Sequence, residues 1–349
     1  MKRVLQTLAA LAVLAGLAGG AVVGLGLYNV SARVGHLQGV SWVLHTTFRN
    51  SVRLRAARPA EMPDLSDPAL IELGARHYDT ACRSCHAAPG EAQSATMAAM
   101  VPAPPPIGQA VQGWKPYQLH WIVANGIKMS GMPPWPAQRE DDVWPVVAFL
   151  SSVQQGMEGA DYGTLTRLPD EEAPLAYCLG CHGDGGLAQV PPLNGQGAAY
   201  LEMALQAYRG GTRASGIMAQ AAREVPPETM GDLARWFAAQ PVAPIPPQDM
   251  PADLVERGRA LVHADTGDPD VPACRACHGP DRSERSAFFP NLAGLPAPYL
   301  RTQLGLWRDG RRGGGPQAGL MRKAARHLDD SDIAALVAYY ASLPAETGQ

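Results

Sequence analysis

The sequence predicts an all-α protein in which one N-terminal transmembrane helix precedes three similar helical units. Three observations predict this fold class. Residues 4–28 form an uncharged apolar run, and a pattern of two cysteines and a histidine occurs three times, at intervals of about 95 residues. No stretch of useful length alternates apolar and polar residues, as a half-buried strand would. We expect the three units at residues 65–157, 168–242 and 252–345.

Residues 1–30 have the features of a membrane anchor or a secretory signal. Lys2 and Arg3 precede the apolar run, which at helical rise spans roughly 38 Å and can cross a bilayer. Because the apolar part of a signal is normally shorter, an uncleaved anchor is favoured, although the small residues 18–21 also suit a cleavage site. In either case the positive end faces the cytoplasm. The expected location is the bacterial inner membrane, with a single pass and the three units in the periplasm.

Residues 31–64 predict a juxtamembrane amphipathic segment. Five arginines and no acidic residue occur between Asn29 and Pro59, and Trp42 and Phe48 lie among them. We expect a helix near the membrane surface, where Arg53 and Arg55 contact lipid headgroups or a partner subunit.

The second unit and the third align well, whereas the first diverges. Pro191-Pro-Leu-Asn-Gly195 matches Pro290-Asn-Leu-Ala-Gly294, and a closing helix is expected at 227–240 and 329–343. In the first unit, helices are expected at 67–81, 114–126 and 141–153.

The repeated pattern is C-x-x-C-H, the attachment signature of c-type haem. Two thiols add to the haem vinyl groups, and the next residue supplies a histidine to the iron. Zinc is excluded because a zinc site of this type takes two C-x-x-C pairs, and the three pairs of this chain cannot be divided that way. Zinc binding also does not require a histidine directly after the second cysteine. The three motifs use all six cysteines of the chain and predict three haem c groups. The attachment cysteines are Cys82, Cys85, Cys178, Cys181, Cys274 and Cys277, and the proximal ligands are His86, His182 and His278.

A methionine follows each motif at a similar distance and is the expected distal ligand. The three are Met132, Met218 and Met321. A thioether in this position raises the reduction potential of the iron. Several residues compete for the role: Met129 in the first unit, Met230 in the second, and His120, His263 and His327 in principle.

Other residues are expected to support the haems. The carbonyls of Pro191 and Pro290 are candidates to orient the proximal histidines, and the run 104–106 leaves the choice open in the first unit. Four residues are candidates either for bonding haem propionates or for ordinary packing: Tyr200, Tyr299, Arg213 and Arg312.

Each unit resembles a class I cytochrome c domain in its leading helix, C-x-x-C-H motif, proline-containing loop, methionine and closing helix. The second and third resemble the cytochrome c4 and c5 group through P-x-L-x-G-x-x-x-x-Y-L and R-x-G-x-R strings. The first, with Gly126-Ile-Lys-Met-Ser-Gly-Met-Pro-Pro-Trp135, is similar to membrane-attached units found beside periplasmic dehydrogenases. In the second unit the leading segment is short and Ala219 follows the methionine where the first unit has proline.

This resemblance implies electron transfer rather than enzymatic catalysis, because histidine and methionine fill both axial positions of each iron. The expected partners are redox proteins: a dehydrogenase or quinol-oxidising complex as donor and a terminal oxidase as acceptor. A net charge of −3 argues against nucleic acid. The alternatives are a stand-alone c4-like shuttle and a haem peroxidase. Small residues at every fourth position of the apolar run favour a subunit with a helix partner: Ala12, Gly16, Gly20 and Gly24.

Overall fold

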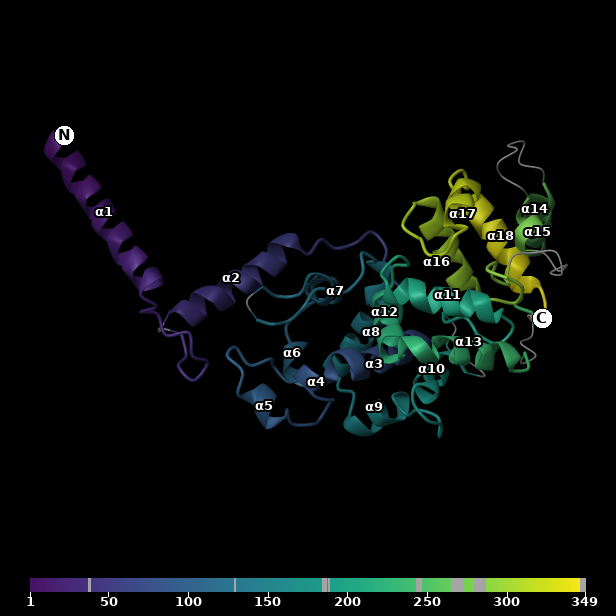
Figure 1. Cartoon of the computed structure of the whole chain (residues 1–349), viewed down its shortest axis with the longest axis horizontal. Coiled ribbons are helices and arrows are strands. Elements are labelled where there is room, and N and C mark those ends of the chain that lie inside the picture. The colour runs from purple at the N-terminus through teal and green to yellow at the C-terminus, as the bar shows by residue number, and fades with distance from the viewer. Residues whose placement is uncertain are drawn as a thin grey trace.

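The computed structural model describes residues 1–36, 39–128, 130–183, 187, 189–242, 247–264, 273–278 and 287–345. The predicted all-α class is confirmed, because these residues contain helices and no strand, with one isolated bridge between Ile127 and Met132. Helix α1 lies at one end of the molecule and the helices of the third unit at the other (Figure 1).

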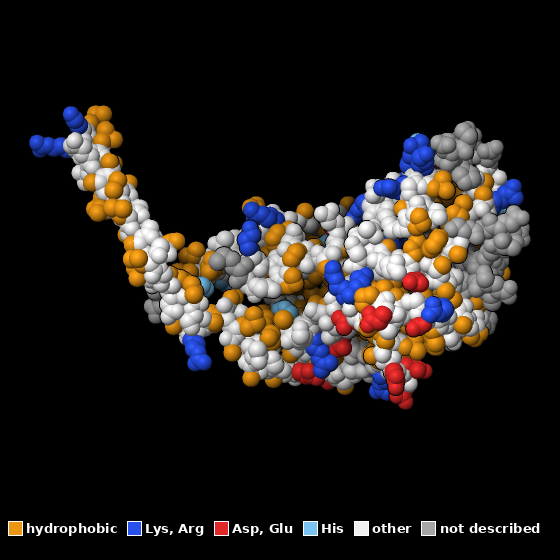
Figure 2. Space-filling model, viewed as in Figure 1, with side chains coloured by type: hydrophobic (Ala, Val, Ile, Leu, Met, Phe, Trp, Pro, Cys, Tyr) orange, Lys and Arg blue, Asp and Glu red, His pale blue; other side chains and the backbone are white. Residues whose placement is uncertain are grey.

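Helix α1 (Lys2–Gly24) projects from the rest of the chain (Figure 1) and buries none of its residues. It is long and apolar enough to cross a membrane. The space-filling view shows basic side chains at its tip and apolar side chains along its length (Figure 2). The helix therefore has the dimensions of a membrane span and the charge placement expected for a cytoplasmic N-terminus.

Helix α2 (Val40–Arg55) follows and packs on the first unit through its C-terminal half. Val52 is fully buried, Phe48 meets Trp114 edge to face at 5.5 Å, and Arg49 lies over the same indole at 5.0 Å. At the other end of the helix, Trp42 is 70% exposed. The expected amphipathic helix is thus present, and it is attached to the first unit by its second half.

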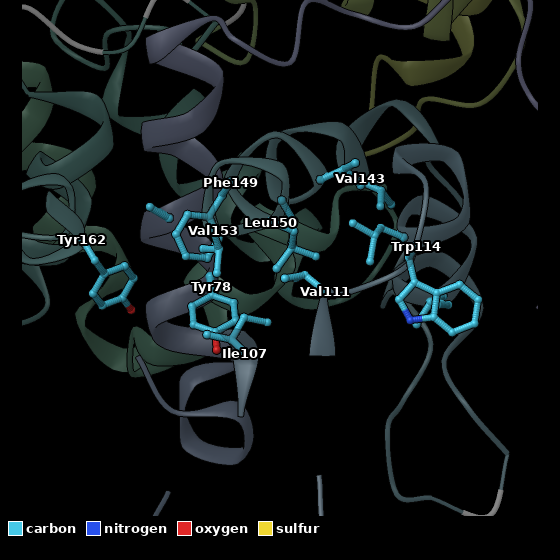
Figure 3. Close-up of a cluster of buried hydrophobic side chains, with 14 of the residues drawn as sticks. Tyr78, Ile107, Val111, Trp114, Val143, Phe149, Leu150, Val153 and Tyr162 are labelled. Atoms are coloured by element: carbon cyan, nitrogen blue, oxygen red, sulfur yellow. The ribbon is translucent and has the colours of Figure 1, made fainter. Parts of the chain in front are cut away.

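The first unit is built on the crossing of α3 (Pro68–Ala81) and α8 (Trp144–Gln154). Asp67 starts α3 by accepting a hydrogen bond from the Ala69 amide, and Gly74 lets α8 approach, since a Cβ there would lie 1.9 Å from the Pro145 carbonyl oxygen. Figure 3 shows the buried cluster beneath this crossing, with Tyr78 facing Phe149. The remaining helices are α4 (Arg83–His86), α5 (Ala95–Ala98), α6 (Ile107–Ala110), α7 (Pro116–Asn125), the 3-10 helix η1 (Asp141–Val143) and α9 (Gly159–Leu165).

The second unit is smaller and lacks a long leading helix of its own. Its helices are α10 (Leu175–His182), α11 (Ala198–Arg209), α12 (Gly216–Glu224), the 3-10 helix η2 (Pro227–Thr229) and α13 (Met230–Ala239). The first unit covers part of it: Thr80 of α3 lies 3.3 Å from the hydroxyl of Tyr177, and a Cβ at Gly180 would lie 3.0 Å from the Arg76 guanidinium. The short leading segment expected from the sequence is therefore compensated by α3.

The third unit repeats the helix crossing of the first. Helix α14 (Ala252–His263) crosses α18 (Asp330–Ser342) at Gly258, where a Cβ would lie 2.1 Å from the Ala335 carbonyl oxygen. Asp329 caps α18 by accepting a hydrogen bond from the Asp332 amide at 2.8 Å. Along the chain, three helices separate α14 from α18: α15 (Cys274–His278), α16 (Ala297–Arg308) and α17 (Ala318–Ala325).

The observed helices differ from the prediction around the candidate methionines. Met218 and Met321 lie within short helices of their own, α12 and α17, which the sequence analysis did not foresee. His327 lies between α17 and α18. The predicted closing helices are confirmed as α8, α13 and α18.

Candidate haem-binding sites

Each motif histidine lies at the end of a short helix and is oriented by a proline carbonyl. The Nδ1 atom of His86 lies 2.8 Å from the Pro105 oxygen, that of His182 lies 2.8 Å from Pro191, and that of His278 lies 3.1 Å from Pro290. The expected hydrogen bonds to Pro191 and Pro290 are confirmed, and Pro105 is the partner in the first unit. With Nδ1 bound as a donor, Nε2 of each ring is left as the basic nitrogen that can bind a metal.

Among the described residues, none of the six motif cysteines forms a disulfide. Burial raises the pKa of Cys82 and of Cys178 to about 12, and that of Cys181 to about 11. Neutral buried thiols do not have the lowered pKa that marks redox-active cysteine pairs. The pairs therefore suit covalent attachment of a group better than dithiol chemistry.

In the first unit, the backbone after His86 is held by a side chain of α3. Ala87 has a positive φ of 57°, and its carbonyl accepts a 2.5 Å hydrogen bond from the buried Tyr78 hydroxyl. Met132 is half-buried and packs on the same core cluster as Cys82. Its rival Met129 lies outside the described residues.

In the second and third units, both motifs open into one continuous cavity of about 520 Å³. The structure brings every expected haem-binding residue of these two units to its wall: Cys178, Cys181, His182, Met218, Cys274, Cys277, His278 and Met321. Met230 is buried in the core of the second unit at 1% exposure and does not line this cavity. His263 and His327 are exposed and do not line it either.

The buried Arg213 and the half-buried Arg312 meet at the wall of this cavity. Arg213 donates to the hydroxyls of Tyr200 at 3.3 Å and Tyr299 at 3.1 Å, so the structure gathers the four expected propionate-binding candidates in one place. The Arg213 guanidinium lies over the ring of Tyr208 at 4.5 Å, and that of Arg312 lies over Trp307 at 5.0 Å. The Nε atoms of both arginines are buried without a hydrogen-bond partner among the described residues.

The positive charges of Arg213 and Arg312 would be balanced by a bound anion. Burial, and then the neighbouring Arg213, lower the pKa of Arg312. Within the described part of the chain, neither arginine forms an ion pair with a carboxylate. Two adjacent cations that are largely removed from water and have no counterion are costly, and a ligand that carries carboxylates relieves that cost. A largely apolar cavity with thiols, imidazoles and thioethers on its wall and paired guanidinium groups beside it therefore fits haem and its propionates.

Some residues of the second site were missed in the sequence. Arg139 and Asp142 of the first unit line the cavity, and Trp135 packs against Gly216 in front of Met218. No local pattern marks them, because the contacts join residues more than 70 positions apart.

Comparisons with known proteins match two parts of the chain to family models. Residues 69–150 match the cytochrome c oxidase, cbb3-type, subunit III model, and residues 255–344 match the cytochrome c model. Among curated proteins, the thiosulfate dehydrogenase electron acceptor of Stutzerimonas stutzeri is 32% identical over 59% of this chain and 98% of its own length. Cytochrome c4 of Azotobacter vinelandii is 34% identical over 49% of this chain and 87% of its own length.

Two solved structures are similar to part of this chain. Cytochrome c4 of Acidithiobacillus ferrooxidans is 30% identical, covering 48% of this chain and 98% of that one, with a TM-score of 0.42. Thiosulfate dehydrogenase of Marichromatium purpuratum is 38% identical over 48% of this chain and 36% of that one, with a TM-score of 0.42.

The motifs, their proline-bound histidines and the sequence relatives define an electron-carrying protein with covalently bound haem. The chain belongs to the c-type cytochromes, in the family that includes cytochrome c4. Haem c is accordingly its cofactor, its function is electron transfer, and its partners are redox proteins.

Proposed function

We propose that the chain is a membrane-anchored trihaem cytochrome c that connects a periplasmic dehydrogenase or quinol-oxidising complex to a terminal oxidase. The observation that carries the proposal is the shared cavity of about 520 Å³, lined by two complete sets of haem-binding side chains. The third set, in the first unit, has the same histidine–proline hydrogen bond. The domains are proposed at 65–157, 168–242 and 252–345.

Each haem would be held by its two cysteines and by one histidine–methionine pair. The proposed axial pairs are His86 with Met132, His182 with Met218, and His278 with Met321. Bound haem supplies a reversible one-electron change at iron. The protein holds the imidazoles in position through Pro105, Pro191 and Pro290. It also encloses the second and third haem sites in one apolar cavity, which favours transfer between neighbours over exchange with solvent.

Helix α1 and the sequence relatives support the proposed membrane location and the proposed electron donor. An exposed apolar helix with Lys2 and Arg3 at its start fits a single pass of the inner membrane with the three units in the periplasm. The name of the Stutzerimonas stutzeri relative identifies it as the electron acceptor of a dehydrogenase, which supports a dehydrogenase as donor here.

The haem count is tested by mass spectrometry of protein matured in a host that attaches haem c. We expect the mass of the chain plus three haems. Replacing both cysteines of one motif by alanine, in three separate variants, should remove one haem each time. A wild-type protein with two haems, or a motif variant that keeps all of its haem, contradicts the proposal.

The axial assignment in the first unit is tested with Met132→His. Ferric haem with a methionine ligand has a weak absorption band at the red end of the visible spectrum. We expect this variant to lose the share of the band due to one haem, and the potential of that haem to fall, because imidazole replaces a thioether. An unchanged band and unchanged potentials would show that Met132 is not a ligand.

The cytochrome c4 relatives support a second candidate, a stand-alone electron shuttle. Purification in mild detergent without crosslinking separates the two. Copurification of a dehydrogenase or a quinol-oxidising complex supports the subunit role. A chain that comes out alone and is fully reduced by soluble donors supports the shuttle.

A further inference from the structure

A carboxylate of the first unit caps a helix of the second unit. Asp142 in η1 accepts hydrogen bonds from the Gly216 amide at 2.6 Å and the Ile217 amide at 3.3 Å. It also accepts one from the Ser215 hydroxyl at 3.1 Å. All of these groups lie at the start of α12, where the first amides of a helix have no partner within the helix and a negative charge is favourable.

Arg139 holds this carboxylate and the same segment of chain. Its guanidinium lies 3.8 Å from an Asp142 oxygen and donates at 3.3 Å to the Ala214 carbonyl. It also forms a hydrogen-bonded ion pair with Asp141. Both Arg139 and Asp142 are buried at 8% exposure. Burial raises the pKa of Asp142, while Arg139 and the α12 amides oppose that change.

The cap continues to the candidate axial ligand. The Ser215 hydroxyl, which donates to Asp142, accepts a hydrogen bond from the Met218 amide at 3.2 Å. Asp142, Ser215 and Met218 all line the shared cavity. An unbroken series of hydrogen bonds therefore links Asp142 to the residue that faces the second haem site.

Trp135 of the first unit packs against the same segment. A Cβ at Gly216 would lie 2.2 Å from the Trp135 ring, so the indole rests directly on the α12 backbone. Trp135 lies three residues after Met132, and Gly216 lies two residues before Met218. The loop that carries one candidate ligand is thus packed against the helix that carries the next.

The third unit offers a comparison within the same chain. Helix α17, which carries Met321, begins without a side-chain cap hydrogen bond, and the Met321 amide donates to the Gln317 carbonyl at 3.1 Å. Of the two described helices that carry a candidate methionine, α12 is therefore capped by a carboxylate from another unit and α17 is not.

We propose that the Arg139–Asp142 pair of the first unit positions Met218 as the axial ligand of the second haem and thereby sets the potential of that haem. The inference rests on the proposed assignment of Met218 as a ligand. Asp142 acts through Ser215 and the α12 backbone, so it is a positioning residue. The second haem then has its methionine placed by the unit that also holds the first.

The test compares Asp142→Ala and Asp142→Asn in the full-length, haem-loaded chain. Alanine removes the cap, so we expect loss of the share of the methionine–iron band due to one haem and a lowered potential for one haem of the three. Asparagine is itself a good cap, so Asp142→Asn should retain the band. Ser215→Ala removes only the connecting hydroxyl and should weaken the band in a chain that folds as the wild type does.

Asp329→Ala is the matched control, because it removes an aspartate cap from α18, which carries no candidate ligand. We expect it to lower thermal stability and leave all three potentials unchanged. If Asp142→Ala behaves in the same way, with an intact band and unchanged potentials, Asp142 has a purely structural role and the inference is wrong.

Met218→Ala separates this inference from the ligand assignment on which it rests. Loss of the band in Met218→Ala, together with an intact band in both Asp142→Ala and Ser215→Ala, overturns the positioning role alone. An intact band in Met218→Ala overturns the ligand assignment and the positioning role together.

Discussion

His77 shows how burial changes the titration of a single side chain. It lies in α3 at 4% exposure, and its ring centroid is 4.8 Å from that of Trp135. Its Nδ1 atom has no hydrogen-bond partner among the described residues. Burial lowers the pKa of His77 to about 4, because no neighbouring group compensates the charged imidazolium for its lost hydration.

This pKa predicts acid sensitivity of the fold. Between pH 6.5 and about 4 the unfolded chain binds a proton at His77 that the folded chain does not, so stability falls as the pH is lowered through this range. The full effect is about 3 kcal/mol. In chemical denaturation of the haem-loaded protein, His77→Phe should flatten the pH dependence of the unfolding free energy between pH 6.5 and 4. Equal slopes in the variant and the wild type would contradict a neutral buried imidazole.

At the scale of elements, glycine at a helix crossing sets how closely two helices pack. Gly258 in α14 faces the Ala335 carbonyl and the Tyr339 side chain of α18, whereas Gly305 in α16 faces open space. The same substitution is therefore expected to have opposite effects at the two positions.

Gly258→Ala should lower the unfolding free energy by about 1–3 kcal/mol, because the added methyl group forces the crossed helices apart. Gly305→Ala is the matched control and should raise it by about 0.5–1 kcal/mol, since alanine is the better helix former. Thermal unfolding of the two haem-loaded variants measures the change in unfolding free energy caused by each substitution. Similar changes in the same direction would show that the crossing is not tightly packed at Gly258.

The elements were largely predictable from the sequence, and their contacts were not. Periodic apolar positions and the Asp67 and Asp329 caps mark α3 and α18 to within about one or two residues, the usual precision of helix ends. The motif histidines and cysteines follow from their spacing. The helices around Met218 and Met321 were missed, because they are short and packing against other elements stabilises them more than local propensity does.

At the scale of the whole molecule, the proposed anchor α1 would fix the proposed electron relay to the membrane. We predict that the mature protein retains α1 and needs detergent for extraction. Paired Leu11→Arg and Leu14→Arg substitutions should release it into the soluble fraction, since each arginine near the centre of the span costs about 2.5–3.5 kcal/mol. Intact-mass measurement of the mature chain gives its N-terminus. A chain that begins within or just after the small residues 18–21 would show that the segment is a cleaved signal.

The arrangement of the units could not be predicted from the sequence, because it depends on contacts between distant parts of the chain. The contacts of Asp142 with α12 join parts of the chain that are far apart, as does the two-way hydrogen bonding between Gln196 and Asn291 at 2.9 Å. Each depends on surfaces that exist only after the units have folded. The repeat in the sequence predicts similar units but contains no signal for how one unit rests on the next.

The adjacent side chains of Arg213 and Arg312 have a consequence for how the protein is made in the cell. Before haem is attached, closing the second unit on the third would bring two like charges together away from water with no anion to balance them. We therefore expect maturation to run in a fixed order, with covalent loading first and docking of the two units second. A chain that lacks one of these haems should therefore stay open at this contact and be cleaved more easily by a protease.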